Sequence, residues 1–208
     1  MSKAKTKIAV LVSGGGTNLQ ALIDAEKSGI IKSGEIVLVL SNNQSAYALQ
    51  RAYNAHIPTA IITKKAYGGD REAFEKAMIE TLKKSGAELI VLAGFMSILG
   101  KGFIDAFRDR IINVHPALIP SFCGEGFYGL KVHEAALNYG VKVTGATVHF
   151  VNEIPDGGKI IAQKAVKIKN GDTPETLQRR VMEQAEWKIL PASAELISKK
   201  IMNEKKRA

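Results

Sequence analysis

Short apolar segments alternate with amphipathic segments along the first half of the chain. The apolar segments are rich in Ile, Val and Leu, as buried strands are, and lie at 7–12, 35–40, 59–62, 88–93 and 111–115. Between them, apolar residues recur at the spacing of a helix, within 19–23, 46–52, 70–82 and 103–107. Such strict alternation predicts an α/β fold with a Rossmann-like, doubly wound and mainly parallel sheet.

The last third of the chain departs from this alternation. Residues 143–151 and 159–166 both have the pattern of strands, and the segment Asn-Glu-Ile-Pro-Asp-Gly-Gly between them predicts a hairpin. We therefore expect antiparallel C-terminal strands. Thr173 and Pro174 then mark the start of a long helix, which we expect Pro191 to break or kink.

A glycine-rich turn, Ser13-Gly-Gly-Gly-Thr-Asn18, joins the first predicted strand to a helix. Free N–H groups at a helix N-terminus, together with the helix dipole, favour a phosphate. The turn lacks the lysine of a P-loop, and Leu19 stands where the dinucleotide fingerprint has its third glycine. The second strand also ends in Ser41-Asn-Asn43 rather than in an acid. We therefore predict a monophosphate ligand, the alternative being a tight turn without a ligand.

Asn113 and His115 form a polar pair at the end of the fifth predicted strand. Residues two apart in a strand share a face, so both side chains can look into the same space. An amide donor beside an imidazole suits a reaction that builds charge on a carbonyl oxygen and moves a proton. Asp156, before two glycines, could orient His115 and raise its pKa. The alternatives are a buried polar loop for the pair and an Asx turn for Asp156.

Other candidate ligand contacts are weaker. The apolar loop from Met96 to Leu99 follows the fourth strand and could hold a flat aromatic ligand or be local core. Arg71, after the helix cap Asp70, could be surface or could reach an anionic ligand. Glu183 and Glu186 are three residues apart in a predicted helix, so we expect them to share a face and either bind a polyhydroxyl ligand or be solvated.

The composition sets broad limits on the kind of protein. The 208 residues suit one domain, and we expect 1–6 and 203–208 to be flexible tails. Lysines near the two ends supply much of the net charge of +9, which indicates solvated ends rather than a nucleic-acid site. Cys123 is the single cysteine, which suits a reducing compartment, the cytoplasm, and we give it no catalytic role. No apolar run reaches transmembrane length.

Six motifs within residues 7–196 together resemble the phosphoribosylglycinamide formyltransferase family, which is folate-dependent. They are Val12-Ser-Gly-Gly-Gly-Thr-Asn-Leu-Gln20, Leu40-Ser-Asn-Asn43, Leu92-Ala-Gly-Phe-Met96, Asn113-Val-His-Pro116, Ala146-Thr-Val-His-Phe-Val151 and Asp156-Gly-Gly158. The resemblance implies the formyltransferase fold. It also implies transfer of a formyl group from the co-substrate 10-formyltetrahydrofolate to the amine of glycinamide ribonucleotide in purine biosynthesis, without a metal.

The resemblance further assigns roles to individual residues. It implies that Asn113 and protonated His115 stabilise an oxyanion while Asp156 keeps His115 basic. The implied substrate contacts are Gly16, Thr17, Asn18, Glu183 and Glu186. The implied folate contacts are Arg71, Met96, Ser97, Ile98, Leu99, Asn113, Asn152, Glu153, Ile154, Pro155 and Asp156.

Three other functions remain as alternatives. Methionyl-tRNA formyltransferase has a similar domain but continues into a tRNA-binding domain, for which we expect this chain to be too short. Formyltetrahydrofolate deformylase carries an N-terminal regulatory domain, which we expect to be missing here. A non-catalytic nucleotide-binding module would not need the Asn113, His115 and Asp156 set. We expect small-molecule substrates, neither nucleic acid nor membrane as partner, and a monomer or homodimer.

Overall fold

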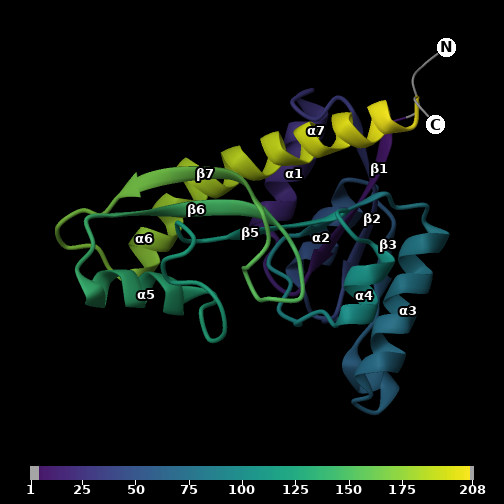
Figure 1. Ribbon diagram of the computed structural model, residues 1–208, viewed down its shortest axis with the longest axis horizontal. Helices are drawn as coiled ribbons and strands as arrows, with labels where there is room; N and C mark the ends of the chain where they lie inside the picture. The colour runs from purple at the N-terminus through teal and green to yellow at the C-terminus, as the bar shows by residue number, and fades with distance from the viewer. Residues whose placement is uncertain (1–4, 207–208) are drawn as a thin grey trace.

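The structure, a computed structural model, describes residues 5–206 and contains a seven-stranded sheet (Figure 1). The strand order is β3-β2-β1-β4-β5-β6-β7, with β1 to β5 parallel and the last two strands antiparallel to their neighbours. The strands are β1 (Thr6–Val12), β2 (Gly34–Ser41), β3 (Thr59–Ile61), β4 (Leu89–Leu92), β5 (Ile111–His115), β6 (Val143–Phe150) and β7 (Ile160–Lys167). The predicted doubly wound sheet with antiparallel C-terminal strands is confirmed.

Helices cover both faces of this sheet. They are α1 (Thr17–Lys27), α2 (Tyr47–Asn54), the 3₁₀ turn η1 (Lys64–Tyr67), α3 (Arg71–Lys84), α4 (Lys101–Ala106), α5 (Leu130–Tyr139), α6 (Pro174–Val181), the π-helix η2 (Met182–Glu186) and α7 (Trp187–Glu204). In Figure 1 the long helix α7 crosses over α1 and β1, while α3 and α4 lie together on the other side of the sheet. The carboxyl ends of the parallel strands are thereby left as the edge at which a ligand can bind.

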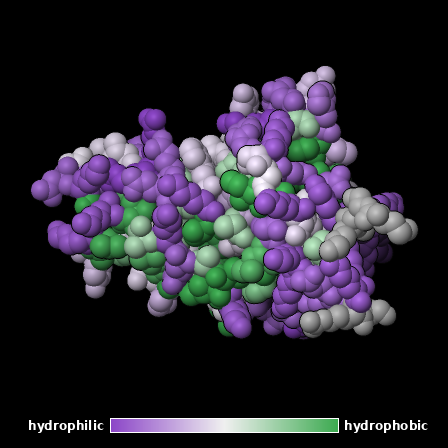
Figure 2. Space-filling model, turned by 90° about the horizontal axis from the view of Figure 1, so that it is seen from above, coloured by the Kyte–Doolittle hydropathy of each residue, from purple (hydrophilic) through white to green (hydrophobic). Residues whose placement is uncertain are grey.

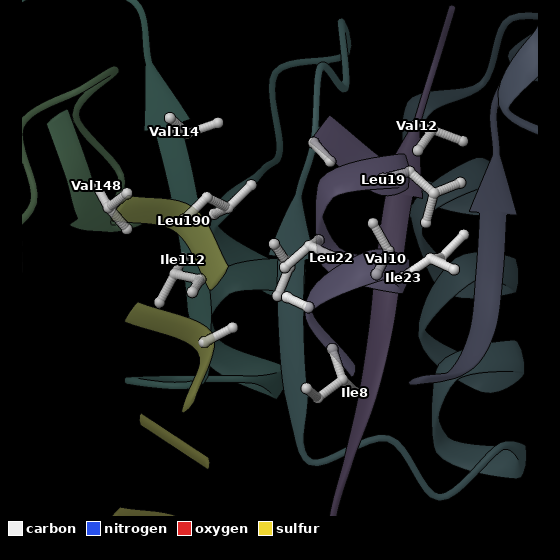
Figure 3. Close-up of a cluster of buried hydrophobic side chains, with 14 of the residues drawn as sticks. Ile8, Val10, Val12, Leu19, Leu22, Ile23, Ile112, Val114, Val148 and Leu190 are labelled. Carbon is white, nitrogen blue, oxygen red and sulfur yellow. The ribbon is translucent and has the colours of Figure 1, made fainter. Parts of the chain in front are cut away.

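Alternate residues of the central strand β1 point into two separate cores. Ile8 and Val10 pack in one core with Leu22 of α1 and Leu190 of α7 (Figure 3). The other core lies under α3 and α4 and takes in Leu11 together with Phe74, Met78 and Phe103. Continuously apolar strands are what a sheet covered on both faces requires, because each face must be buried. The rigidity of this double core fixes the positions of the strand ends.

Two helix starts read from the sequence are confirmed. The Asp70 carboxylate accepts hydrogen bonds from the backbone N–H groups of Glu72 and Ala73, as an N-cap does. Thr173 caps α6 in a reciprocal capping box with Thr176, and Pro174 occupies the first helical position. Bidentate contacts of 2.5 Å between Arg180 and Asp172 tie the same helix to the loop before it.

Of the break or kink expected at Pro191, the break is wrong, because α7 continues through Pro191 to Glu204. The irregularity lies earlier, in the π-helix η2 that separates α6 from α7. Trp187, four residues before the proline, has a ψ of −2° rather than the regular value of about −42°. This rotation turns the Trp187 carbonyl, which the proline ring would otherwise meet.

The predicted tails are partly ordered structure. Thr6 begins β1, is fully buried and donates from Oγ1 to the Ser198 carbonyl. At the other end, α7 runs to Glu204, and Lys205 makes an ion pair of 2.5 Å with Glu88. The expectation of flexible tails is therefore wrong for these residues, and its remainder at 1–4 and 207–208 lies outside the described residues.

The surface mixes hydrophobic and hydrophilic side chains. Figure 2 shows a face on which hydrophobic side chains form a band bordered by hydrophilic ones. Within residues 5–206, none of the helices has both the length and the apolar character needed to cross a bilayer.

Candidate active site

Four polar side chains meet where β5 and β6 lie side by side. The Nδ1 atom of His115 is 3.4 Å from Oδ2 of Asp156, and Nε2 of His149 is 3.5 Å from Oδ1 of the same carboxylate. The amide of Asn113 contacts Nε2 of His149 at 3.2 Å. We call these four residues, Asn113, His115, His149 and Asp156, the catalytic cluster. The predicted approach of Asp156 to His115 is present in the structure.

Strand pairing brings this cluster together. Asn113 lies opposite His149 in the antiparallel register of β5 and β6. Asp156 reaches the pair from the loop between β6 and β7, where its φ of 54° places it in the left-handed region that Asp tolerates better than most residues. A Cβ on the following Gly158 would lie 1.7 Å from the Phe150 carbonyl oxygen, so the loop needs glycine there.

The two ring nitrogens of His115 both face hydrogen-bond acceptors. Nε2 is 2.8 Å from the Phe122 carbonyl oxygen, and Nδ1 faces the Asp156 carboxylate. A neutral imidazole has one N–H and can satisfy only one of these acceptors, whereas an imidazolium satisfies both. The site is therefore built to accommodate the protonated ring when a reaction produces it.

Burial nevertheless lowers the pKa of His115 below its ordinary value, and the charge of Asp156 only partly offsets this effect. Asp156 does act to raise the pKa of His115, as expected, but the net pKa is lowered because desolvation of the cation outweighs this attraction. A neutral imidazole is the form that accepts a proton. His115 thus rests in the state of a general base.

Burial by itself would raise the pKa of Asp156. Its contacts with His149, the Gly124 amide and the charge on His115 outweigh burial, so the net pKa is lowered. The Gly124 N–H donates to Oδ2 at 2.9 Å. Asp156 therefore stays ionised beside an imidazole that can gain a proton, which is how a carboxylate orients and supports a catalytic histidine.

A cavity of about 830 Å³ extends from this cluster to the start of α1 and the π-helix. Its lining includes Asn113, His115 and Asp156 of the cluster, together with Asn18, Met182 and Glu186. The apolar loop after β4 and the glycine-rich loop before α5 form its remaining walls. The structure thus brings the three predicted catalytic residues and two of the predicted substrate contacts, Asn18 and Glu186, to one space of a size that holds small-molecule ligands, while Gly16, Thr17 and Glu183 are not among its lining residues.

The glycine turn leads into the start of α1, where Asn18 lines this space. Gly16 has a φ of 73° and precedes α1, and a Cβ on it would lie 2.6 Å from Cβ of Ala48. Only glycine therefore allows α2 to pack this closely on the turn. Thr17 and Asn18 follow as the first residues of α1, whose N-terminus favours an anion.

Asn18 and Glu186 face each other across the helix ends. The Asn18 amide donates to Oε2 of Glu186 at 2.6 Å, while Oδ1 of Asn18 is buried and has no hydrogen-bond partner within residues 5–206. Burial raises the pKa of Glu186 to about 7, although the Asn18 hydrogen bond lowers it somewhat. Such a pair has hydrogen-bonding capacity left for a ligand.

Glu183 does not join Glu186. Its side chain is exposed and pairs with Arg179 at 2.8 Å, outside the residues that line the cavity. The prediction of a shared face is wrong, because both residues lie in the π-helix. In a π-helix each hydrogen bond spans five residues instead of four, so the i, i+3 rule of the α-helix no longer applies.

A smaller cavity of about 140 Å³ lies on the other side of Asn113, between the loop after β4 and the loop of Asp156. The predicted folate contacts that line it are Ser97, Ile98, Leu99, Asn113, Asn152, Glu153, Ile154, Pro155 and Asp156. Met96 and Ile98 also line the larger cavity. Ile98 and Ile154 are 67% and 65% exposed, which is unusual for such side chains and suits contact with a flat apolar group.

Arg71 lies next to this region rather than in the cavity lining. Its guanidinium donates to Oε1 of Glu75 at 2.8 Å and to the Ile98 carbonyl at 3.2 Å. The side chain is about half exposed. Arg71 thus holds the loop after β4 and still presents a positive charge to solvent.

The sequence analysis assigned no functional role to two buried histidines. His149 contacts the catalytic cluster, but its position follows from the pairing of β5 with β6, which the sequence does not reveal. His133 is fully buried in α5 beside the cavity, and neither ring nitrogen has a hydrogen-bond partner in the described chain. Burial, with the nearby His115, lowers its pKa to about 4. For Cys123, burial raises the pKa of the thiol, which disfavours the nucleophilic thiolate.

Comparison with known proteins shows which protein family this chain is similar to. Residues 6–193 match the formyl transferase family. The chain is 43% identical over 185 residues to phosphoribosylglycinamide formyltransferase of Haemophilus influenzae, covering 89% of this chain and 84% of that protein. It is 47% identical over 194 residues to the trifunctional purine biosynthetic protein adenosine-3 of Gallus gallus, covering 93% of this chain. It spans only 18% of that relative's length.

A solved structure agrees with these relatives. Glycinamide ribonucleotide transformylase 1 from Symbiobacterium toebii superposes with a TM-score of 0.88 at 39% identity, covering 96% of this chain and 93% of that one. The fold, the cavity and the sequence therefore lead to one conclusion. This chain belongs to the formyl transferase family and, within it, to the phosphoribosylglycinamide formyltransferases.

Proposed function

We propose that this chain transfers the formyl group of 10-formyltetrahydrofolate to the amine of glycinamide ribonucleotide, giving N-formylglycinamide ribonucleotide in purine biosynthesis. The observation that carries the proposal is the meeting of Asn113, His115 and Asp156 at one cavity. That cavity runs from an anion-favouring helix end to an apolar loop. Such a site suits a phosphorylated amine on one side and a flat, apolar formyl donor on the other.

The ribonucleotide would occupy the part of the cavity near α1. Gly16, Thr17 and Asn18 would hold its phosphate at the helix N-terminus. Glu186 and the unpartnered oxygen of Asn18 would accept hydrogen bonds from its hydroxyl or amide groups. Glu183 points away from this space and pairs with Arg179, so any contact it makes would need that ion pair to open.

The folate would lie against the apolar loops. Met96, Ser97, Ile98 and Leu99 on one side and residues 152–156 on the other would enclose its pterin ring. The exposed side chains of Ile98 and Ile154 support this fit, because a bound ring would remove them from water. Arg71, half exposed beside Ile98, would attract an anionic tail.

The reaction follows from the hydrogen-bonding capacities of the catalytic cluster. The substrate amine attacks the formyl carbon, and the carbonyl electron pair moves onto oxygen. One N–H of the Asn113 amide is used by His149, and the other remains to stabilise this oxyanion. With its single N–H on Nδ1 toward Asp156, neutral His115 accepts the amine proton at Nε2, which then can donate to the Phe122 carbonyl, and Asp156 supports the resulting imidazolium. The imidazolium then gives its proton to the departing folate nitrogen as the carbon–nitrogen bond breaks.

An absorbance assay of tetrahydrofolate release tests the proposal. We expect release only when glycinamide ribonucleotide is present, with one formylated product per folate consumed. Release that does not need the ribonucleotide would favour a hydrolase instead. Absence of any reaction, with the ribonucleotide still bound, would favour a binding module. The prediction that this site works without a metal is tested by repeating the assay after treatment with a chelator.

A further inference from the structure

The three peptide groups of the glycine turn are each held from the same side. The Ser13 carbonyl accepts from Nδ2 of Asn43 at 3.1 Å, and the Gly14 carbonyl accepts from the Ala48 N–H at 3.0 Å. The Gly15 carbonyl accepts from Nε of Arg51 at 2.8 Å. All three donors belong to α2 or to the loop that leads into it.

This arrangement fixes the direction of the N–H groups. In a trans peptide the C=O and N–H bonds point in opposite directions across one plane. Because the three carbonyls point toward α2, the N–H groups of the three residues that follow them point away from α2. Successive N–H groups oriented together form an anion-binding concavity. The turn is therefore preorganised for an anion before any ligand arrives.

Arg51 differs from the other two donors because it is charged and makes further contacts. Its Nη1 donates to Oε1 of Gln20 on α1 at 3.1 Å, and its guanidinium lies 5.0 Å from the centre of the Tyr47 ring. One planar side chain thus joins α2, the turn and α1. The rigid guanidinium of arginine suits such a set of contacts better than the flexible ammonium of lysine.

A second feature indicates that a ligand contacts this helix end. Asn18, two residues after Gly16, is 9% exposed and lines the large cavity. Its Oδ1 atom is buried without a hydrogen-bond partner among the described residues. Buried polar atoms are nearly always paired, so this oxygen is ready for a donor on a ligand.

We propose that Arg51 is a positioning residue for phosphate binding. By holding the Gly15 carbonyl toward α2, it keeps the Gly16 N–H directed at the phosphate of the substrate, and its charge adds to the positive potential at the turn. Arg51 acts through the turn, and touches neither the formyl group nor the catalytic cluster. This inference rests on the proposed function, because the phosphate it concerns is that of the proposed substrate.

The test compares Arg51→Gln, Arg51→Lys and the charge-matched control Arg108→Gln. Arg108 is a surface residue paired with Asp105 on α4, away from the turn. Two quantities are measured for each variant: the KM for glycinamide ribonucleotide and, by calorimetry, the Kd of ribose 5-phosphate. The KM for folate and the Tm are recorded alongside, because a merely structural loss would move them too.

We expect Arg51→Gln to raise both the KM for the ribonucleotide and the Kd of ribose 5-phosphate by roughly tenfold or more, as loss of a charged hydrogen bond does. The folate KM should stay unchanged, Arg51→Lys should recover part of the loss, and Arg108→Gln should match the wild type. Unchanged phosphate affinity in Arg51→Gln would overturn the inference. So would an equal loss for folate. If Arg51→Gln does not fold, wild-type affinity in Arg51→Lys would overturn it.

The two measurements also separate this inference from the proposed function. Binding of ribose 5-phosphate requires no formyl transfer. A wild-type protein that binds ribose 5-phosphate but transfers no formyl group would refute the proposed function. The role of Arg51 could then still be tested by the Kd of ribose 5-phosphate in its variants. A protein that transfers the formyl group normally, but whose Arg51→Gln variant keeps the wild-type KM, would refute only the inference.

Discussion

Two regions beside the same cavity differ in whether their buried polar atoms have hydrogen-bond partners. In the catalytic cluster, Asn113, His115, His149 and Asp156 contact one another or the backbone. On the helical wall, formed by the ends of α1 and α5 and the π-helix, polar atoms are buried without partners in residues 5–206. These atoms are Oδ1 of Asn18 and both ring nitrogens of His133, while Glu186 has the single partner Asn18.

With the proposed function, this difference assigns the chemistry to the catalytic cluster and ligand binding to the helical wall. A cluster that satisfies its own hydrogen bonds holds its groups in one orientation, which proton transfer requires because small misplacements are costly. Buried donors and acceptors without partners cost free energy until a ligand pairs with them. The helical wall therefore favours ligands whose hydrogen-bonding groups are complementary to its own. Changes in the catalytic cluster should alter turnover, and changes in the helical wall should alter affinity or stability.

The largest expected effect is that of Asp156→Asn. Removing the carboxylate charge removes the larger of the two effects that offset the burial of His115, so its pKa should fall further and the imidazolium should form less readily. We expect kcat to drop by about 10²- to 10⁴-fold, with little change in the KM for the ribonucleotide. Steady-state kinetics would measure both.

The matched control for this carboxylate is Glu80→Gln, an exposed acid on α3 outside both cavities. It should retain wild-type kcat. A wild-type kcat in Asp156→Asn itself would refute the assignment of proton transfer to the catalytic cluster. A rise in KM alone would show that Asp156 acts in ligand binding rather than in proton transfer. It would also contradict the distinction between the catalytic cluster and the helical wall.

The next effect concerns stability and the unpartnered His133. Its folded-state pKa of about 4 lies below the ordinary value of about 6.5, so between these values the unfolded chain binds a proton that the folded chain does not. Stability should therefore fall as the pH falls from 6.5 toward 4. The loss due to this residue should reach about 2 kcal/mol at pH 5.

Urea denaturation of the wild type and His133→Asn at pH 7 and pH 5 measures this contribution as a difference between the two proteins. The comparison cancels other groups, including Glu186, whose raised pKa gives stability that is lost as the pH rises from about 4.5 to 7. His56→Asn is the control, because His56 is exposed and its positive φ suits asparagine. A pH-independent difference for His133→Asn would show that His133 is paired in solution.

The same contrast explains what the sequence could predict. Asn113 and His115 were predictable because strand alternation is local and because the carboxyl ends of parallel strands bind ligands. The approach of Asp156 to His115 was one of two interpretations that the residues left open, the other being an Asx turn, and the family resemblance favoured it, since a hairpin loop carries no signal of where it folds. His149 was missed for the same reason: its place depends on the order β5-β6 in the sheet.

The helical wall was less predictable because its geometry departs from a regular α-helix. The spacing of Glu183 and Glu186 indicates one face only if the helix is regular, and η2 is a π-helix. Pro191 was the available signal of irregularity, but the adjustment lies before the proline rather than at it. The direction of the net pKa shift of His115 could not be predicted either, because it depends on burial, which a sequence motif does not indicate.

A smaller effect is expected from Glu186. With a pKa of about 7, its carboxyl group is protonated in a large fraction of molecules near neutral pH. Glu186→Gln keeps the acceptor for Asn18 and the shape of the side chain, so the KM for the ribonucleotide should change little. Glu186→Ala removes a hydrogen-bonding group and should raise that KM about tenfold, with kcat nearly unchanged.

Glu183→Gln provides the comparison within the same π-helix. Because Glu183 is exposed and already paired with Arg179, its substitution should change the KM less than Glu186→Ala does. If Glu186→Gln is as impaired as Glu186→Ala, the negative charge of Glu186 is what the substrate requires. If kcat falls instead of affinity, the helical wall takes part in the chemistry.

The smallest effect tests how the π-helix is held in place. Thr173 caps α6, and α6 leads directly into the residues that carry Glu186. Thr173→Ala should lower the unfolding free energy by about 1 kcal/mol through loss of the cap. The two tight contacts between Arg180 and Asp172 should keep α6 in position. The KM for the ribonucleotide should then stay at the wild-type value, because Thr173 is outside the cavity lining, which α6 joins only at Gln178. A tenfold rise in that KM, with normal stability, would mean that the N-terminus of α6 sets the position of the helical wall. Ligand binding at the helical wall would then depend on exact placement as much as catalysis at the catalytic cluster does.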